Sequence, residues 1–203
     1  MQTTSRETIL NAIRSNLPKQ RVAAPAIPEF AWTGGALRAE FIRRLEEAGG
    51  AAHDVANAAE AEVKLKALHP EAKVICSAVP EIAGTRRAES VKDPHELADV
   101  DVGVVRAQFA IAEGGAVWLT QEDLIVDALG FLSQHLVVLL DPDQIVADMH
   151  AAYRRIRLEA TNYGCFMMGP SATADVEATL VHGAQGVRSL NAFFLRKAAA
   201  AMT

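Results

Sequence analysis

The sequence lacks the features that place a protein in a membrane, on nucleic acid or outside the cell. No apolar run approaches the roughly 20 residues that a membrane-spanning helix needs. The chain begins MQTTSRE, which is polar where a secretory signal is apolar. The formal net charge is -5 and no basic stripe occurs, which argues against nucleic acid as a partner. We therefore expect a cytoplasmic protein of bacterial type.

Cysteine is scarce, and the histidines form no metal-binding pattern. Cys76 and Cys165 lie inside apolar runs, which is typical of buried strand residues. The sequence contains no C-x-x-C, so the chain alone cannot hold a four-cysteine iron–sulfur cluster or zinc site. None of the 6 histidines is paired as H-x-x-x-H or H-x-H. We expect no metal and no cofactor.

The apolar content points to one core preceded by a separate N-terminal segment. Hydrophobic residues make up 50% of the 203, which is enough for one sizeable core. Thr4 precedes Glu7 by the spacing of a capping box, apolar residues then recur at helical spacing, and Pro18 stops that helix. Residues 18–35 are rich in proline and glycine. We predict an N-terminal helix and arm over residues 1–35 and an α/β domain over residues 36–203. The arm either docks on another subunit of a homo-oligomer or folds back onto its own domain.

Apolar runs alternate with helical patterns after residue 36. The strongest run, residues 136–140, is typical of a strand that is covered on both faces. The predicted strands are residues 51–55, 73–76, 102–105, 116–119, 136–140, 165–168 and 192–195. The predicted helices are one closed by Gly49-Gly50, then 56–68, 79–83, 141–156 and 174–181, with an irregular or helical link over 106–113. The alternation predicts an α/β fold of three layers around a mostly parallel sheet, with functional groups at the carboxyl ends of the strands.

The loop Ala112-Glu113-Gly114-Gly115-Ala116 is the first candidate site. Two consecutive glycines allow a sharp turn and bring backbone amides close to a ligand. Glu113 beside them could act as a general base or a nucleophile. The alternative is a tight connection with an exposed glutamate.

The stretch Gly169 to Glu177, GPSATADVE, is the second candidate. It is predicted to turn from a strand into a helix, where Ser171 and Thr173 could cap the helix or contact a ligand. Asp175 and Glu177 are two apart, so on a helix they point roughly opposite ways and cannot work as a carboxylate pair. Asp175 is expected to organise the turn. The alternative is an acid-rich helix start without a ligand.

Two cationic positions follow, and an earlier histidine is set apart from them. His182 is predicted in the last turn of the helix that Gly183 ends, where the helix dipole favours it. His182 or Arg188 could instead hold an acidic ligand, since the guanidinium matches a carboxylate. His135 is predicted at the amino end of the strongest strand, away from the ligand edge, in a structural role.

These stretches together resemble the LUD domain family, in its lactate utilization protein C-like branch. The resemblance is carried by residues 109–117, by residues 135–146, and by GPSATADVE followed by Val181-His182-Gly183 and Gly186. It spans about residues 36–197. It implies a fold like that of glucosamine-phosphate isomerase, ribose-phosphate isomerase and CoA transferases.

The resemblance also implies a role in a three-component system that oxidises L-lactate to pyruvate. Two partners resemble iron–sulfur proteins, and this component carries no cluster. Three residues depart from the family pattern: Ala172 stands where a cation is usual, Gly114 where threonine is usual and Val187 where proline is common. The alternatives are an acyl- or CoA-handling enzyme with Glu113 as its catalytic residue, or a module that binds a small carboxylate or phosphate. The ligand-binding residues are then predicted as Gly114, Gly115, Ser171, Thr173, Asp175, His182 and Arg188.

Overall fold

The structure is a computed structural model that describes residues 4–18, 23, 25–28, 30–157, 161–170, 172–173, 181–182 and 186–197. The chain divides into two compact units, Met1–Ala31 and Trp32–Thr203. The first unit holds helix α1 (Ser5–Asn16). The side chain of Thr4 accepts the N–H of Glu7, and the carboxylate of Glu7 accepts the N–H of Thr4. This reciprocal pair confirms the predicted capping box.

The second unit contains the remaining helices and strands. The helices are α2 (Leu37–Glu47), α3 (Ala58–Leu68), η1 (Ala88–Ser90), η2 (Pro94–Leu97), α4 (Gln121–Leu124), α5 (Leu129–Leu132), η3 (Pro142–Gln144) and α6 (Met149–Arg155). The strands are β1 (Ala51–Asp54), β2 (Ile75–Ser77), β3 (Arg86–Arg87), β4 (Val102–Arg106), β5 (Phe109–Ile111), β6 (Ala116–Thr120), β7 (His135–Leu140), β8 (Ile145–Val146), β9 (Gly164–Met167), β10 (Ala172–Thr173), β11 (Val181–His182) and β12 (Ser189–Phe194).

A six-stranded parallel sheet forms the centre of this unit. Its strand order is β1-β12-β7-β4-β2-β3, and every neighbouring pair is parallel. The central strands β7, β12 and β4 are almost continuously buried, as their apolar runs predicted. The predicted α/β class with a mostly parallel sheet is confirmed.

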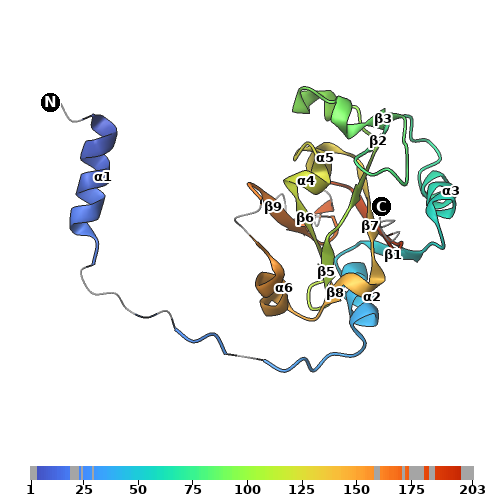
Figure 1. Cartoon of the computed structure of the whole chain (residues 1–203). Coiled ribbons are helices and arrows are strands. Elements are labelled where there is room, and N and C mark those ends of the chain that lie inside the picture. Colours follow the sequence, from blue (N-terminus) through green and yellow to red (C-terminus); the bar gives the residue numbers. More distant parts are fainter. Residues whose placement is uncertain are drawn as a thin grey trace, which may run out of the picture. The chain divides into compact units, whose positions relative to one another are not determined.

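One face of this sheet packs on helix α3, which Figure 1 shows on the opposite side of the sheet from α4, α5 and α6. Ala61 and Leu65 of α3 are completely buried in a cluster with Val102 and Val104 of β4 and with Phe193 of β12. The helix starts where Asn57 accepts the N–H of Glu60, and it ends at His69. The end of α3 therefore lies at the edge of the sheet where the parallel strands begin.

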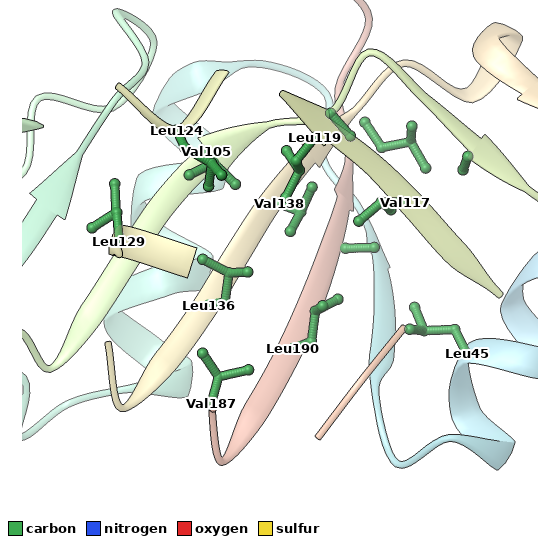
Figure 2. Close-up of a cluster of buried hydrophobic side chains, with 14 of the residues drawn as sticks. Leu45, Val105, Val117, Leu119, Leu124, Leu129, Leu136, Val138, Val187 and Leu190 are labelled. Atoms are coloured by element: carbon green, nitrogen blue, oxygen red, sulfur yellow. The ribbon is translucent and has the colours of Figure 1, made fainter. Parts of the chain in front are cut away.

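The other face packs on a second sheet of four strands, in the order β8-β5-β6-β9. Figure 2 shows Leu136, Val138 and Leu190 of the large sheet grouped with Val117 and Leu119 of β6. Helices α2, α4 and α5 complete this cluster through Phe41, Leu45, Leu124 and Leu129. The outer face of the second sheet is covered by α6, whose Ala152 packs with Phe109, Ile111 and Trp118.

Two predictions are wrong because the second sheet uses very short strands. Residues 106–113 form no helix: Phe109–Ile111 is strand β5, antiparallel to β6. Residues 141–156 are not one helix. Pro142–Gln144 is a 3-10 turn, Ile145–Val146 pairs in parallel with β5, and only Met149–Arg155 is helical.

The predicted helix over residues 174–181 is wrong at its end. Val181 and His182 form strand β11, which pairs antiparallel with Ala172 and Thr173 of β10. His182 therefore does not lie in a helical turn, and residues 174–180 lie outside the described residues. The stretch GPSATADVE enters a two-stranded ribbon at Ala172 instead of turning directly into a helix.

The predicted helix over residues 79–83 is absent from the described structure. The hydroxyl of Ser77 donates to the carbonyl oxygen of Val79 and accepts its N–H, which closes a turn there. Val79 and Ile82 are buried against the α3 face. Within the described part of the chain, no helix is both long and apolar enough to cross a bilayer.

Candidate functional site

Glu113, Gly114 and Gly115 form the turn between β5 and β6. The side chain of Glu113 is exposed, and its Oε2 accepts the backbone N–H of Met149 at 3.0 Å. Met149 is the first residue of α6, so the carboxylate satisfies one of the free N–H groups at a helix start. The predicted catalytic glutamate thus has a structural contact, and its chemistry stays a prediction.

Gly115 is fixed by its close approach to helix α2. Its φ is +62°, a backbone conformation that favours glycine. A Cβ at this position would collide with the backbone nitrogen of Leu45. Gly114 has no such restriction, because a Cβ there would meet only the Cβ of Ala116 at 3.9 Å. The predicted tight turn therefore exists. Its second glycine, Gly115, is required because it packs directly against the backbone of α2.

The Gly169-Pro170 turn reaches the same helix roughly one turn further along. Gly169 has φ +110°, and a Cβ on it would lie 2.6 Å from the carbonyl oxygen of Ala48. Pro170 is buried and lies beside Gly49. The structure thus brings the first two candidate sequence motifs together on the carboxyl half of α2.

The other predicted ligand residues of GPSATADVE, and His182 after it, are placed only in part. Thr173 pairs with Val181 and His182 pairs with Ala172 across the ribbon of β10 and β11. Ser171 and Asp175 lie outside the described residues. The predicted contact of Ser171, Thr173 and Asp175 with a ligand is therefore still a prediction.

Charged groups at the carboxyl edge of the large sheet are paired with one another. Arg106 ends β4 and pairs with Glu81 at 2.7 Å, and it also donates to the carbonyl oxygen of Leu195 at 3.0 Å. Arg196 pairs with Asp143 at 2.9 Å. Asp54, which ends β1, pairs with Arg38. At this edge, where the sequence predicts ligand-binding groups, the three arginines Arg38, Arg106 and Arg196 are therefore paired with acids of the protein.

The opposite edge, where the parallel strands begin, contains a cavity of about 420 Å³. We call it the amino-edge cavity. The residues that line it include His69, Glu71, Asp101, Gln134, His135 and Arg188. They come from the end of α3 and from the starts of β4, β7 and β12, which the parallel order of the sheet places side by side. Of the predicted ligand-binding residues, Arg188 alone is known to lie here.

The two histidines of the amino-edge cavity stack on each other. The ring centres of His69 and His135 are 4.4 Å apart, with 31° between the ring planes. The Nδ1 of His135 is 2.8 Å from the hydroxyl of Ser189. Ser189 is 3.5 Å from the amide nitrogen of Asn191, and the amide oxygen of Asn191 is 3.1 Å from Nε2 of His53. A row of polar groups thus runs from the cavity along β12 and orients His135.

The surroundings of both histidines favour the neutral form of the ring. Burial lowers the pKa of His69, and the neighbouring His135 lowers it further. Burial also lowers the pKa of His135, with a further decrease from Arg188 and an opposing effect from Asp101. The ordinary pKa of histidine is 6.5, so both rings are mainly neutral near pH 7.

Sequence reasoning missed His69 and placed His135 in a structural role. A signal was present, because His135 directly precedes an apolar strand and Arg188 lies just before another. Residues at the starts of parallel strands share one edge of the sheet. The predicted last strand began at residue 192, three residues late, which left Arg188 in a loop with no assigned edge.

A smaller cavity of about 220 Å³ lies on the outer face of the second sheet. Phe109 and Trp118 line it, and Arg155 lies over the ring of Phe109 at 5.0 Å. Arg155 also donates to the amide oxygen of Gln144. Beside the cavity, Asp123 accepts hydrogen bonds from Thr120 and Gln108, while burial raises the pKa of its carboxyl. Most polar groups in and beside this smaller cavity are hydrogen-bonded to one another, so it is a weaker candidate for a ligand site than the amino-edge cavity.

Comparison with known proteins gives one family match. The family model described as LUD domain matches residues 83–195, more than half of the chain. The match extends from before β3 to the end of β12, so it includes both Glu113 and Arg188.

One curated relative and one solved structure are similar to the chain. Lactate utilization protein C of Shouchella clausii (strain KSM-K16) is 28% identical over 113 residues, which cover 53% of this chain and 49% of the relative. The chain thus matches about half the length of that relative. The crystal structure of a DUF162 family protein from Deinococcus radiodurans matches with a TM-score of 0.53 and 20% identity. It covers 77% of this chain and 97% of that one, and the likeness shows the fold.

Proposed function

The chain belongs to the LUD domain family, and from that membership we propose that it serves the utilization of L-lactate. The observation that carries the proposal is the family match over residues 83–195. A relative whose name is Lactate utilization protein C supports it, at 28% identity over about half of each chain. The family match contains the central strands β4, β7 and β12, whose starts supply Asp101, His135 and Arg188 to the amino-edge cavity.

We further propose that the chain is an accessory component that acts beside iron–sulfur proteins. Oxidation of lactate to pyruvate releases two electrons and two protons, and another group must accept the electrons. The sequence holds only Cys76 and Cys165, too few for a four-cysteine cluster. Burial raises the pKa of both thiols, which disfavours the thiolate that binds metal. Partner proteins that carry clusters would then accept the electrons.

Growth of the source organism on lactate tests the first proposal. An in-frame deletion should abolish or strongly slow growth with L-lactate as the carbon source and leave growth on pyruvate unchanged. Expression of the full chain from a plasmid should restore growth on lactate. Normal growth of the deletion strain on lactate would contradict a role in lactate use.

Purification of the tagged full chain from lactate-grown cells tests the second proposal. Iron and acid-labile sulfide should co-elute with the chain and with the partner proteins. The matched control is the same tagged chain from pyruvate-grown cells, where less partner should be recovered. A chain that restores growth yet elutes without iron or labile sulfide would separate lactate use from a stable iron–sulfur complex.

A further inference from the structure

The amino-edge cavity contains donor groups that no described residue uses. The Nε2 of His69 is buried and has no hydrogen-bond partner among the described residues. Arg188 is exposed, and its guanidinium forms no ion pair with any residue in the described part of the chain. Buried polar atoms are nearly always hydrogen-bonded, so the unsatisfied ring nitrogen of His69, a residue that lines the cavity, calls for a partner that the described residues do not supply.

The two acids of the cavity either accept backbone hydrogen bonds or are exposed to solvent. Asp101 accepts the backbone N–H of Lys73 at 2.7 Å and that of Val74 at 2.9 Å. Those hydrogen bonds lower the pKa of its carboxyl, which keeps it ionised and stabilised by the loop before β2. Glu71 is exposed to solvent, which screens its charge. Arg188 is therefore a cation whose charge the described protein leaves available.

His135 is positioned so that one ring nitrogen is hydrogen-bonded within the protein and the other can form a hydrogen bond to a ligand. Its Nδ1 contacts the hydroxyl of Ser189, which the row through Asn191 to His53 supports. With Nδ1 engaged, Nε2 is the atom free to donate or accept in the cavity. A fixed histidine beside an arginine is a suitable arrangement for holding a small oxyanion.

We propose that the amino-edge cavity binds a small oxyanion, a carboxylate or a phosphate, between Arg188 and the pair His69 and His135. The site differs from the carboxyl edge, at which ligands of open α/β sheets usually bind. It uses one predicted ligand residue, Arg188, and two residues to which the sequence assigned no ligand.

Binding should be coupled to the uptake of a proton. The charged groups that face the histidine pair are Arg188 and Asp101, with Glu71 at the rim, and the lowered pKa of Asp101 keeps its carboxyl ionised. Both rings are mainly neutral near pH 7, because burial lowers the pKa of each, with a further decrease from His135 at His69 and from Arg188 at His135. The negative charge of a bound anion favours the protonated form of a neighbouring histidine. One ring therefore takes up a proton from the buffer as the anion binds. Linkage then makes the affinity rise as the pH falls, by at most about tenfold per pH unit for one proton.

Isothermal titration calorimetry of the full chain tests the site with three probes: inorganic phosphate, L-lactate and acetate. Titrations at about pH 6 and about pH 7.5, each in two buffers of different ionisation enthalpy, report both affinity and proton uptake. We expect at least one probe to bind saturably, more tightly at the lower pH, with net uptake of protons. Phosphate and carboxylates are separate arms, so the result also identifies which oxyanion the cavity prefers.

Variants assign the binding to named side chains. Arg188→Gln should weaken binding roughly tenfold or more, because it removes a charged hydrogen bond. Its side chain is exposed, so the fold should be preserved, as circular dichroism can verify. His69→Gln and His135→Gln should remove the proton uptake. The controls are His95→Gln, which alters a 96% exposed side chain, and Arg196→Gln at the opposite edge of the sheet.

The proposal is overturned by the absence of saturable binding of all three probes at millimolar concentration. It is also overturned if Arg188→Gln binds as tightly as the unchanged chain. These outcomes are independent of the growth test, because an oxyanion site can exist in a protein that does not serve lactate. Conversely, loss of growth on lactate in the deletion strain would stand even if the cavity proved empty.

Discussion

Gly115 shows how a single residue can be fixed by packing and not by chemistry. Its positive φ and the closeness of Leu45 leave no room for a side chain. We expect Gly115→Ala to lower the free energy of unfolding by roughly 2–4 kcal/mol, from backbone strain and overpacking together. Urea denaturation would measure the change.

The neighbouring glycine is the matched control for that substitution. Gly114→Ala should change the free energy of unfolding by less than about 0.5 kcal/mol, because its Cβ would meet only Ala116 at ordinary contact distance. Equal losses in both variants would show that the turn, and not the contact with α2, requires glycine.

Glu113 can be assigned to structure or to chemistry by a pair of substitutions. Glu113→Ala removes the acceptor for the N–H of Met149 and should lower the free energy of unfolding by about 1 kcal/mol. Glu113→Gln keeps an acceptor oxygen and should cost about half as much. Denaturation curves measure both, with Glu46→Ala, which alters an exposed side chain on α2, as the control.

The same variants should then be tested for growth on lactate. The hydrogen bond to Met149 favours a capping role, so Glu113→Gln should support growth. If Glu113→Gln is stable but abolishes growth, Glu113 is the catalytic residue that the sequence predicts. The test separates a structural role of Glu113 from a catalytic one, because the conservative variant Glu113→Gln largely preserves the start of α6.

At the scale of elements, the sequence predicted long buried strands well and short ones poorly. Residues 102–105 and 136–140 are apolar on both faces, and that pattern predicts a strand without any knowledge of its partners. Strand β5 has only three residues and β8 only two. The first pairs with β6 directly after it, but β5 and β8 pair with each other across more than 30 residues of chain. A local pattern does not contain that information.

The region after β7 shows how a true periodicity can mislead. Ile145, Val146, Met149 and Ile156 recur at helical spacing, which predicted one helix from residue 141. Ile145 and Val146 instead form β8, the edge strand of the second sheet, and Asp148 starts α6 by accepting the N–H of Ala151. A start signal inside a periodic segment, here Asp148, would have divided it correctly.

The candidate site was predictable only in part. Arg188 was chosen for its chemistry and does line a cavity, whereas His69 belongs to the end of α3 and approaches it only through the packing of that helix. The sequence predicts Glu113 and Arg188 as residues of one site. In the structure the first lies on a turn against α2, and the second lies at the amino edge of the large sheet.

Helix α1 provides a test at the same scale. Ile9 and Ile13 of this helix and Leu17, which follows its last residue, are 54–58% exposed, and no residue of the helix is buried. Deletion of residues 1–31 should therefore change the melting temperature of the sheet domain by no more than about 2 °C. Scanning calorimetry of the full and shortened chains measures this, and a larger fall would show that α1 stabilises its own domain.

The predicted homo-oligomer can be tested with the same helix. Ile9→Ser with Ile13→Ser should reduce the mass measured by light scattering if the apolar face of α1 joins two copies. Asn11→Ala with Ser15→Ala alters the polar side of the helix and should leave the mass unchanged. A monomeric full chain would contradict the predicted assembly through residues 1–35.

For the whole molecule, the partly buried histidine pair predicts how stability depends on pH. In the folded chain the pKa of His69 and of His135 lies below the ordinary 6.5, whereas in the unfolded chain both return to it. Below about pH 6.5 the unfolded state binds more protons, so the free energy of unfolding falls as the pH falls. Urea denaturation between about pH 7.5 and about pH 5.5 should show this slope before most carboxylates titrate.

Substitution of the pair separates this effect from the rest of the chain. The double variant His69→Gln with His135→Gln should lose most of the slope, while His95→Gln, which alters an exposed ring, should keep it. An unchanged slope in the double variant would assign the pH dependence to other groups. If an oxyanion binds with proton uptake, phosphate should stabilise the unchanged chain more at about pH 6 than at about pH 7.5. The double variant should lose that difference, because it has no histidine ring at these positions that could take up a proton and pair with the anion.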